Sequence, residues 1–117
     1  MKKLLAYLLT AATVCASLLM GAQPASASGV MQFYDGTSNV STLLYTADPG
    51  RHALNFCYRL PNGAESRTSY IDNGSSSKWY VYTDSGCAGV PGTIWAHSYG
   101  QMTTPWNNSI STYMRIS

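Results

Sequence analysis

The chain has 117 residues, with seven Lys or Arg, five Asp or Glu, and a formal net charge of +2. Only 10% of the residues are charged, whereas Tyr, Ser, Thr, Asn and Gly are plentiful, which indicates a neutral, hydroxyl-rich surface. This composition argues against nucleic acid or an anionic lipid surface as the natural partner, because both are bound through clusters of Lys and Arg.

The N-terminus has the layout of a secretory signal peptide. Two lysines precede an apolar run over residues 4–20, and the small residues Ala25-Ser26-Ala27 follow. We therefore predict a helical signal peptide, residues 1–27, that is cleaved after Ala27. An uncleaved membrane anchor is the alternative, which the hydroxyl residues within the run disfavour. Cleavage would remove two basic residues and no acidic one, leaving a secreted, formally neutral domain, residues 28–117, with no membrane contact.

The cysteines predict one disulfide bond. Cys15 lies in the predicted signal peptide, so the mature chain keeps Cys57 and Cys87, an even pair in an oxidising compartment. Closing a loop of about 30 residues stabilises a small domain by roughly 3 to 4 kcal/mol. Metal ligation or redox catalysis is the alternative use of two cysteines, but the chain has no CxxC spacing.

Short alternating segments rich in aromatic and β-branched residues recur after the signal peptide, separated by turn sequences such as Asp-Pro-Gly and Pro-Asn-Gly. The segments are residues 30–35, 39–46, 54–60, 67–72, 78–83, 92–97 and 111–116. Seven or eight strands in a domain of about 90 residues predict an all-β sandwich or barrel.

The mature chain also contains an internal echo. Thr68-Ser69-Tyr70-Ile71 resembles Ser111-Thr112-Tyr113-Met114, and Phe33-Tyr34-Asp35 then falls near Val81-Tyr82-Thr83. Each copy would hold four strands, which is the number in a Greek key. The predicted copies span approximately residues 30–75 and 76–117.

Residues 82–89, YTDSGCAG, resemble the signature hairpin of βγ-crystallin Greek keys. Tyr82 stands at the first aromatic place of that pattern, Cys87 at the second and Gly89 at the glycine. The resemblance implies a positive φ at Gly89, which few other residues tolerate. The first copy, residues 34–41, keeps only Tyr34 of the three.

A wider set of positions resembles a family of small secreted bacterial proteins, classed as metallopeptidase inhibitors with a βγ-crystallin fold. The matching positions are Cys57, Leu60-Pro61, Arg67-Thr68-Ser69, Val81-Tyr82, Asp84, Cys87 and Gly89. The resemblance implies a secreted, monomeric inhibitor whose partner is an extracellular peptidase. It identifies no reactive bond; the candidate contact segments are the loops near the bridge, residues 59–66 and 86–93.

The stretch from Asn107 to Thr112 is similar to the calcium loop of βγ-crystallins. Asn107, Asn108 and Ser111 would be the metal ligands, and because none is a carboxylate we expect weak calcium binding at most. The favoured interpretation is structural: the asparagines form a turn, and the hydroxyls bond to the hairpin of the opposite copy. We predict no other cofactor.

No residue pattern in the mature chain indicates an enzyme. His52 and His97 are its only histidines, and it has neither a zinc motif nor a nucleophile elbow. A non-catalytic extracellular binding or structural module is therefore the alternative to the inhibitor. Strand alternation places Trp79 with Val81 on one face and Tyr80 with Tyr82 on the other, so we expect one of these pairs to fill the core and the other to stay partly wet.

Overall fold

The computed structural model describes residues 28–117; the predicted signal peptide and Cys15 lie outside the described residues. The described chain forms eight strands: β1 (Met31–Asp35), β2 (Thr42–Ala47), β3 (Cys57–Arg59), β4 (Tyr70–Asn73), β5 (Trp79–Tyr82), β6 (Gly92–Ile94), β7 (Ser98–Gln101) and β8 (Thr112–Arg115). A single 3-10 turn, η1 (Pro49–Arg51), follows β2. Residues 28–117 contain no α-helix, and so no helix there has the length and apolarity to cross a membrane.

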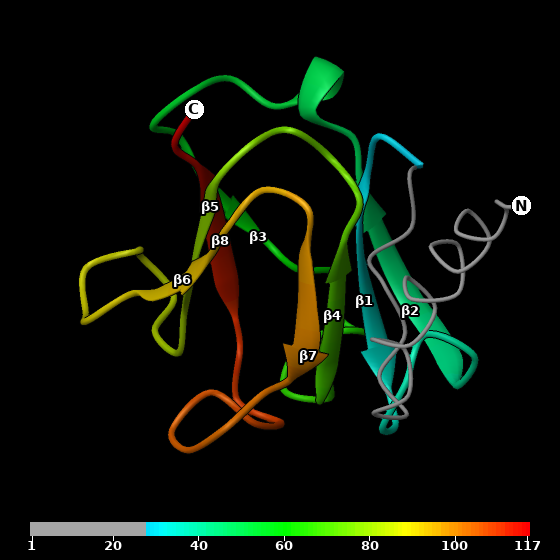
Figure 1. The fold of residues 1–117 in the computed structure, drawn as a ribbon. Coiled ribbons are helices and arrows are strands. Elements are labelled where there is room, and N and C mark those ends of the chain that lie inside the picture. Colours follow the sequence, from blue (N-terminus) through cyan, green and yellow to red (C-terminus); the bar gives the residue numbers. More distant parts are fainter. Residues whose placement is uncertain (1–27) are drawn as a thin grey trace, which may run out of the picture.

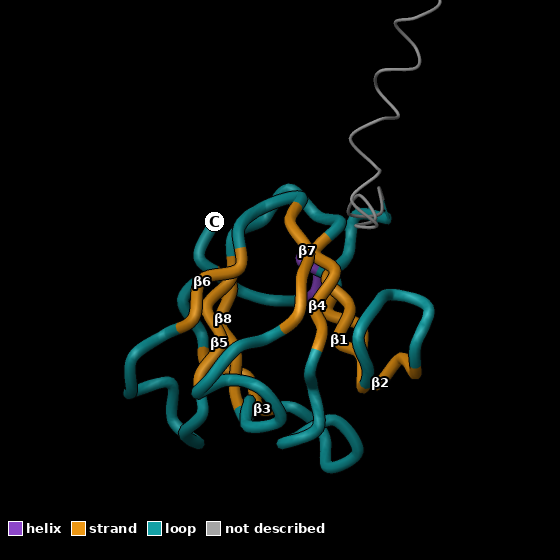
Figure 2. Tube along the Cα trace, turned by 60° about the horizontal axis from the view of Figure 1, so that its bottom comes forward, coloured by secondary structure: helices purple, strands orange, loops and turns teal. Residues whose placement is uncertain are grey.

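The strands form two four-stranded antiparallel sheets that face each other (Figures 1 and 2). One sheet has the order β2-β1-β4-β7 and the other the order β3-β8-β5-β6. Each sheet thus contains three strands from one half of the chain and one strand from the other half. The all-β prediction is confirmed at the level of two four-stranded sheets.

The register of the sheets shows how the two halves correspond. Phe33 pairs with Ile71 in one sheet, and Val81 pairs with Tyr113 in the other. The match of Phe33 with Val81 agrees with the sequence alignment, but Ile71, rather than Tyr70, corresponds to Tyr113. Because successive strand residues face opposite sides, this shift of one residue decides which side chain is internal. Ile71 and Tyr113 belong to the core cluster, and Tyr70 does not.

The loops before β4 and β8 correspond as well. Each makes two backbone bonds to one carbonyl, that of Pro61 in the first half and that of Thr103 in the second, and each then reaches a left-handed residue. The corresponding pairs are Pro61 with Thr103, Ala64 with Trp106, Glu65 with Asn107, and Ser66 (φ 61°) with Asn108 (φ 56°). Corresponding residues of the two halves are therefore separated by the same number of sequence positions throughout these loops and the strands that follow them.

A single apolar core lies between the sheets. Its fully buried side chains include Met31, Phe33, Trp79, Val81 and Tyr113. Of the two sets on this strand, Trp79 and Val81 belong to the core cluster, whereas Tyr80 is half-buried and Tyr82 is buried outside the cluster.

Two of the sequence-predicted strands are reduced to three residues each, and β7 was not predicted. The segment 54–60 forms a strand only over Cys57–Arg59, and the segment 92–97 only over Gly92–Ile94. Asn55 (φ 58°) and His97 (φ 56°) take the left-handed conformation, which a continuous strand does not accommodate. They hold corresponding places, just before the strands that the two halves exchange.

Candidate functional site

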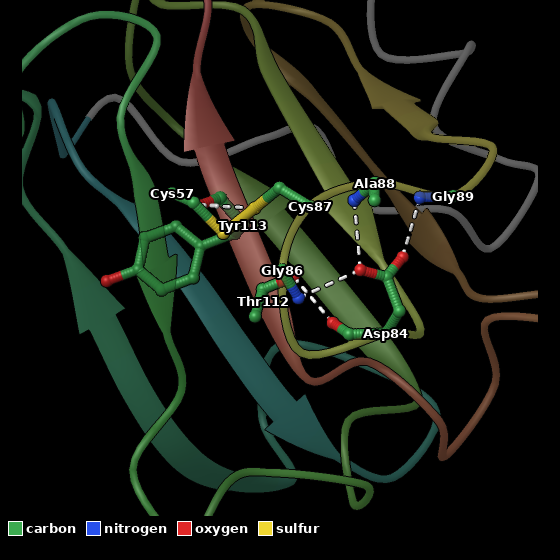
Figure 3. The surroundings of a disulfide bond; sticks show 8 residues. All are labelled: Cys57, Asp84, Gly86, Cys87, Ala88, Gly89, Thr112 and Tyr113. Atoms are coloured by element: carbon green, nitrogen blue, oxygen red, sulfur yellow. Dashed lines mark hydrogen bonds between the residues drawn. A yellow bond between two sulfur atoms is a disulfide. The ribbon is translucent and has the colours of Figure 1, made fainter.

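The predicted disulfide bond between Cys57 and Cys87 is confirmed, with an S–S distance of 2.10 Å and a Cα–Cα distance of 5.8 Å. Cys57 begins β3 of the first half, whereas Cys87 lies in the loop between β5 and β6 of the second half (Figure 3). The bond therefore anchors this loop to a strand from the other half of the chain. We call residues 83–91 the braced loop.

Asp84 organises the braced loop from within. Its Oδ1 accepts the backbone N–H groups of Gly86 and Ala88, both at 2.9 Å, and its Oδ2 accepts that of Gly89 at 2.7 Å (Figure 3). The bonds from Ala88 and Gly86 favour the charged carboxylate and hold the pKa of Asp84 below its ordinary value of 3.8. In the sequence, Asp84 is one of the positions that resemble the inhibitor family, and it lies at a turn where a solvated Asp is the ordinary interpretation.

The loop backbone differs from the expectation for Gly89. The residue with positive φ is Cys87 (φ 53°), and the φ of Gly89 is not positive. Gly89 is instead required by proximity, since a Cβ there would lie 2.8 Å from Oδ2 of Asp84. The hydroxyl of Thr112 on β8 donates to the backbone carbonyl of Asp84 at 2.8 Å, which fixes the start of the loop.

Beyond this network the braced loop presents an apolar tip. Val90 is 80% exposed, the highest value among the large hydrophobic side chains that are exposed. Pro91 follows it and restricts the backbone at the return to β6. An apolar side chain is thus held in solvent on a loop whose conformation is fixed by a covalent bond and by the hydrogen bonds of Asp84.

The other candidate segment, residues 59–66, is less suited to a contact role. Leu60 and Ala64 are buried in the core, and the N–H of Leu60 bonds to the carbonyl of Ser111 at 2.9 Å. Its exposed tip is Pro61-Asn62-Gly63, which offers no large apolar side chain except that of proline. Sequence reasoning gave the two loops equal weight as contact segments. The burial of Leu60 and Ala64 and the exposure of Val90 favour the braced loop.

Two of the three predicted calcium ligands line one cavity. Asn107 and Asn108 line this cavity of about 240 Å³ together with Ser69 and Thr37, and Ser111 is not among its lining residues. The Oγ of Ser111 donates instead to Oε2 of Glu65 at 2.9 Å. Sequence reasoning missed Ser69 as a neighbour of the asparagines, which lie in the other half of the chain.

Two hydroxyls of the repeat, those of Ser69 and Thr112, brace the hairpin of their own half, not that of the opposite copy as the structural interpretation predicted. Ser69 Oγ accepts the N–H of Gly36 at 2.8 Å and donates to the carbonyl of Gly36 at 2.7 Å. Thr112 makes the corresponding bond to Asp84 in the second half. Among residues 28–117 no three His, Cys, Asp or Glu side chains are grouped as a metal site would require.

The three mature tryptophans do not share one exposed surface. Trp79 is fully buried and Trp106 is half-buried, whereas Trp95 is 60% exposed. The Nζ of Lys78 lies 4.6 Å from the centroid of the Trp95 ring. The Lys78 ammonium therefore already covers part of the ring face of Trp95, the exposed tryptophan.

Comparisons of the chain with family models, with curated proteins and with solved structures found no match. What the protein binds is therefore inferred from its own residues.

Proposed function

We propose that this protein is a secreted peptidase inhibitor that places the braced loop in the cleft of an extracellular peptidase. The observation that carries the proposal is Val90, which is 80% exposed on a loop fixed by the Cys87 disulfide and by three bonds to Asp84. A segment that is ordered before binding loses little conformational entropy in the complex, which is what an inhibitor needs.

We also propose that the fold is of the βγ-crystallin type, with two Greek keys that exchange their third strands. The sheet orders β2-β1-β4-β7 and β3-β8-β5-β6 support this interpretation. The equal sequence separation of corresponding residues in the loops before β4 and β8 also supports it. The resemblance of the sequence to secreted metallopeptidase inhibitors joins this fold to the proposed activity.

The proposal is tested by titrating purified residues 28–117 against a thermolysin-like and a subtilisin-like enzyme whose active sites have been counted. We expect inhibition of at least one enzyme at micromolar concentration. Val90→Asp should raise the inhibition constant roughly ten- to a hundredfold, because a buried valine contributes about 1.5 to 3 kcal/mol.

Val40 provides a matched control, since it is 79% exposed and lies in the corresponding hairpin of the first half. Val40→Asp should leave the inhibition constant unchanged. Inhibition of neither enzyme at micromolar concentration would remove the proposal, and equal effects of the two substitutions would remove the role of the braced loop.

A non-catalytic binding module with a weak calcium site is the second candidate. The cavity lined by Ser69, Asn107 and Asn108 favours it, because hydroxyl and amide oxygens are calcium ligands. Calorimetry with calcium chloride should give a weak binding heat that is lost in both Asn108→Ala and Ser69→Ala. Ser111→Ala is the control that should keep it, and silence from the unmodified protein would exclude the site.

A further inference from the structure

The chain contains two Asn-Gly pairs that the fold treats differently. Asn62-Gly63 lies at the exposed tip of the loop before β4, and Asn73-Gly74 lies at the end of β4. In such a pair the backbone nitrogen of the glycine can attack the side-chain amide carbon of the asparagine, because glycine has no Cβ to obstruct the approach. The reaction therefore depends on how freely these two groups can move.

Both reacting groups of the first pair are free. Asn62 and Gly63 are exposed, and in the part of the chain that the structure describes no group bonds to the Asn62 amide or to the Gly63 N–H. A Cβ built at Gly63 would have nothing within 4 Å, so there is room around the glycine. The turn that carries the pair is held by the N–H groups of Ala64 and Glu65, which both donate to the carbonyl of Pro61 at 2.9 Å. Bonds of an exposed turn open at low free energy, and opening lets the glycine nitrogen reach the amide carbon.

Both reacting groups of the second pair are held. Asn73 is fully buried, and its Nδ2 donates to the carbonyls of Ser77 and Trp95, each at 2.9 Å. The Gly74 N–H donates to the carbonyl of Val30, also at 2.9 Å. Attack at this pair would require these bonds to break together, and buried bonds open only at high free energy. The fold therefore protects Asn73 and leaves Asn62 open to reaction.

We propose that Asn62 is a site of spontaneous deamidation, with water as the only other reactant. A bond forms between the Gly63 nitrogen and Cγ of Asn62, while the bond from Cγ to Nδ2 breaks. The Gly63 nitrogen gives up its proton, the departing nitrogen takes up a proton, and ammonia leaves a five-membered succinimide ring behind. Water then opens the ring. Cleavage of the new bond to Cγ yields Asp, and cleavage of the original peptide bond yields isoaspartate.

The reaction changes both the charge and the backbone of the turn. Residues 28–117 carry equal numbers of basic and acidic residues, so each conversion makes a formally neutral domain negative. Isoaspartate also adds a carbon to the main chain, which should weaken the two bonds to the Pro61 carbonyl. The braced loop contains neither reacting residue, and the proposal does not depend on the proposed inhibition.

Trypsin separates the two pairs, because it cleaves after Lys and Arg and releases them in the peptides 60–67 and 68–78. The folded protein is incubated at mildly alkaline pH and digested, and mass spectrometry measures the change from amide to acid in each peptide. Peptide 60–67 should accumulate both Asp and isoaspartate, at a rate within about tenfold of that of a synthetic peptide of residues 59–67. Peptide 68–78 should convert at least about a hundredfold more slowly, because its buried bonds must open first.

Gly63→Ala is the matched control. It places a Cβ beside the attacking nitrogen and meets no neighbour in the fold, so it should slow the conversion of Asn62 severalfold while the protein stays folded. In denaturant, Asn73 should convert as fast as Asn62, because only the fold protects it. An unchanged Asn62 after the synthetic peptide has converted, equal rates of the two pairs in the folded protein, or Asp without isoaspartate would overturn the proposal.

Discussion

The hydroxyl of Tyr113 lies 2.7 Å from Nε2 of His52, so a buried hydrogen bond links the last strand of the chain to the segment after η1. Tyr113 also lies 2.8 Å from the hydroxyl of Tyr45, and Nδ1 of His52 lies 2.7 Å from the carbonyl of Asp48. Because a carbonyl only accepts, Nδ1 carries the hydrogen, and Nε2 of the neutral ring accepts from Tyr113. This chain of bonds joins the two halves through the core.

Tyr113→Phe should destabilise the protein by about 1 to 3 kcal/mol, since it leaves Nε2 of the buried His52 without its donor. Urea unfolding at neutral pH measures the change in free energy. Tyr80→Phe is the control, because Tyr80 is half-buried outside the core cluster, and its effect should stay within about 0.5 kcal/mol. An unchanged free energy of unfolding in Tyr113→Phe would show that the hydroxyl adds nothing to the stability of the core.

The same substitution should change the alkaline limit of stability. Burial, with a smaller contribution from the bond to Tyr45, raises the pKa of Tyr113 above its ordinary value of 10.0. A raised pKa means that the stabilisation is complete below pH 10 and is lost as the pH rises above it. Stability measured above about pH 10 should therefore fall less steeply in Tyr113→Phe than in the unmodified protein. Parallel curves would contradict this assignment.

Asp84→Asn should loosen the braced loop without unfolding the sheets. The lowered pKa of Asp84 means that its bonds are intact above the ordinary value of 3.8 and are lost as the pH falls through the lowered value. In the variant, the amides of Gly86, Ala88 and Gly89 should exchange faster at neutral pH. Lowering the pH should cause no further loss of their protection, because the variant has no carboxylate to protonate at this position. Unchanged exchange of these three amides in the variant would show that the carboxylate does not order the loop.

Replacing both Cys57 and Cys87 by serine should lower the free energy of unfolding by roughly 3 to 4 kcal/mol, because the unfolded chain regains the freedom of a closed loop of about 30 residues. Denaturant unfolding of the variant, compared with the oxidised and the reduced unmodified protein, measures this loss. The reduced protein should match the variant, and a variant as stable as the oxidised protein would refute the expectation.

Gly92→Ala should destabilise the protein by about 1 to 3 kcal/mol through overpacking. A Cβ at Gly92 would lie 2.9 Å from Cε2 of Trp106, an atom of a rigid ring. Gly63→Ala is the matched control, because nothing lies within 4 Å of a Cβ built there, and its effect should stay within about 0.5 kcal/mol. Thermal unfolding followed by tryptophan fluorescence compares the two variants.

Much of the strand content could be predicted because segments rich in aromatic and β-branched residues overlap seven of the eight strands. β7 could not, since its sequence SYGQ contains no β-branched residue and includes a glycine. The register of the repeat was misplaced by one residue because Tyr70 and Tyr113 look alike in sequence, whereas burial matches Ile71 with Tyr113.

The candidate site was predictable only where it depends on residue type. Two cysteines in a chain that is expected to be secreted predict a bond between them, and the structure contains it. The role of Asp84 requires three N–H groups to converge on one carboxylate around a left-handed Cys87, which no local pattern announces. Ser69 meets Asn108 only because the halves exchange strands, and this too is invisible in a linear sequence.

The exchange of β3 and β7 makes each half incomplete on its own. A fragment ending within residues 74–78 would leave β3 without its partner β8, and the complementary fragment would leave β7 without β4. The two fragments should therefore refold together when mixed, and neither should fold alone. A protein made of one such half would need a second copy of itself to complete its sheets.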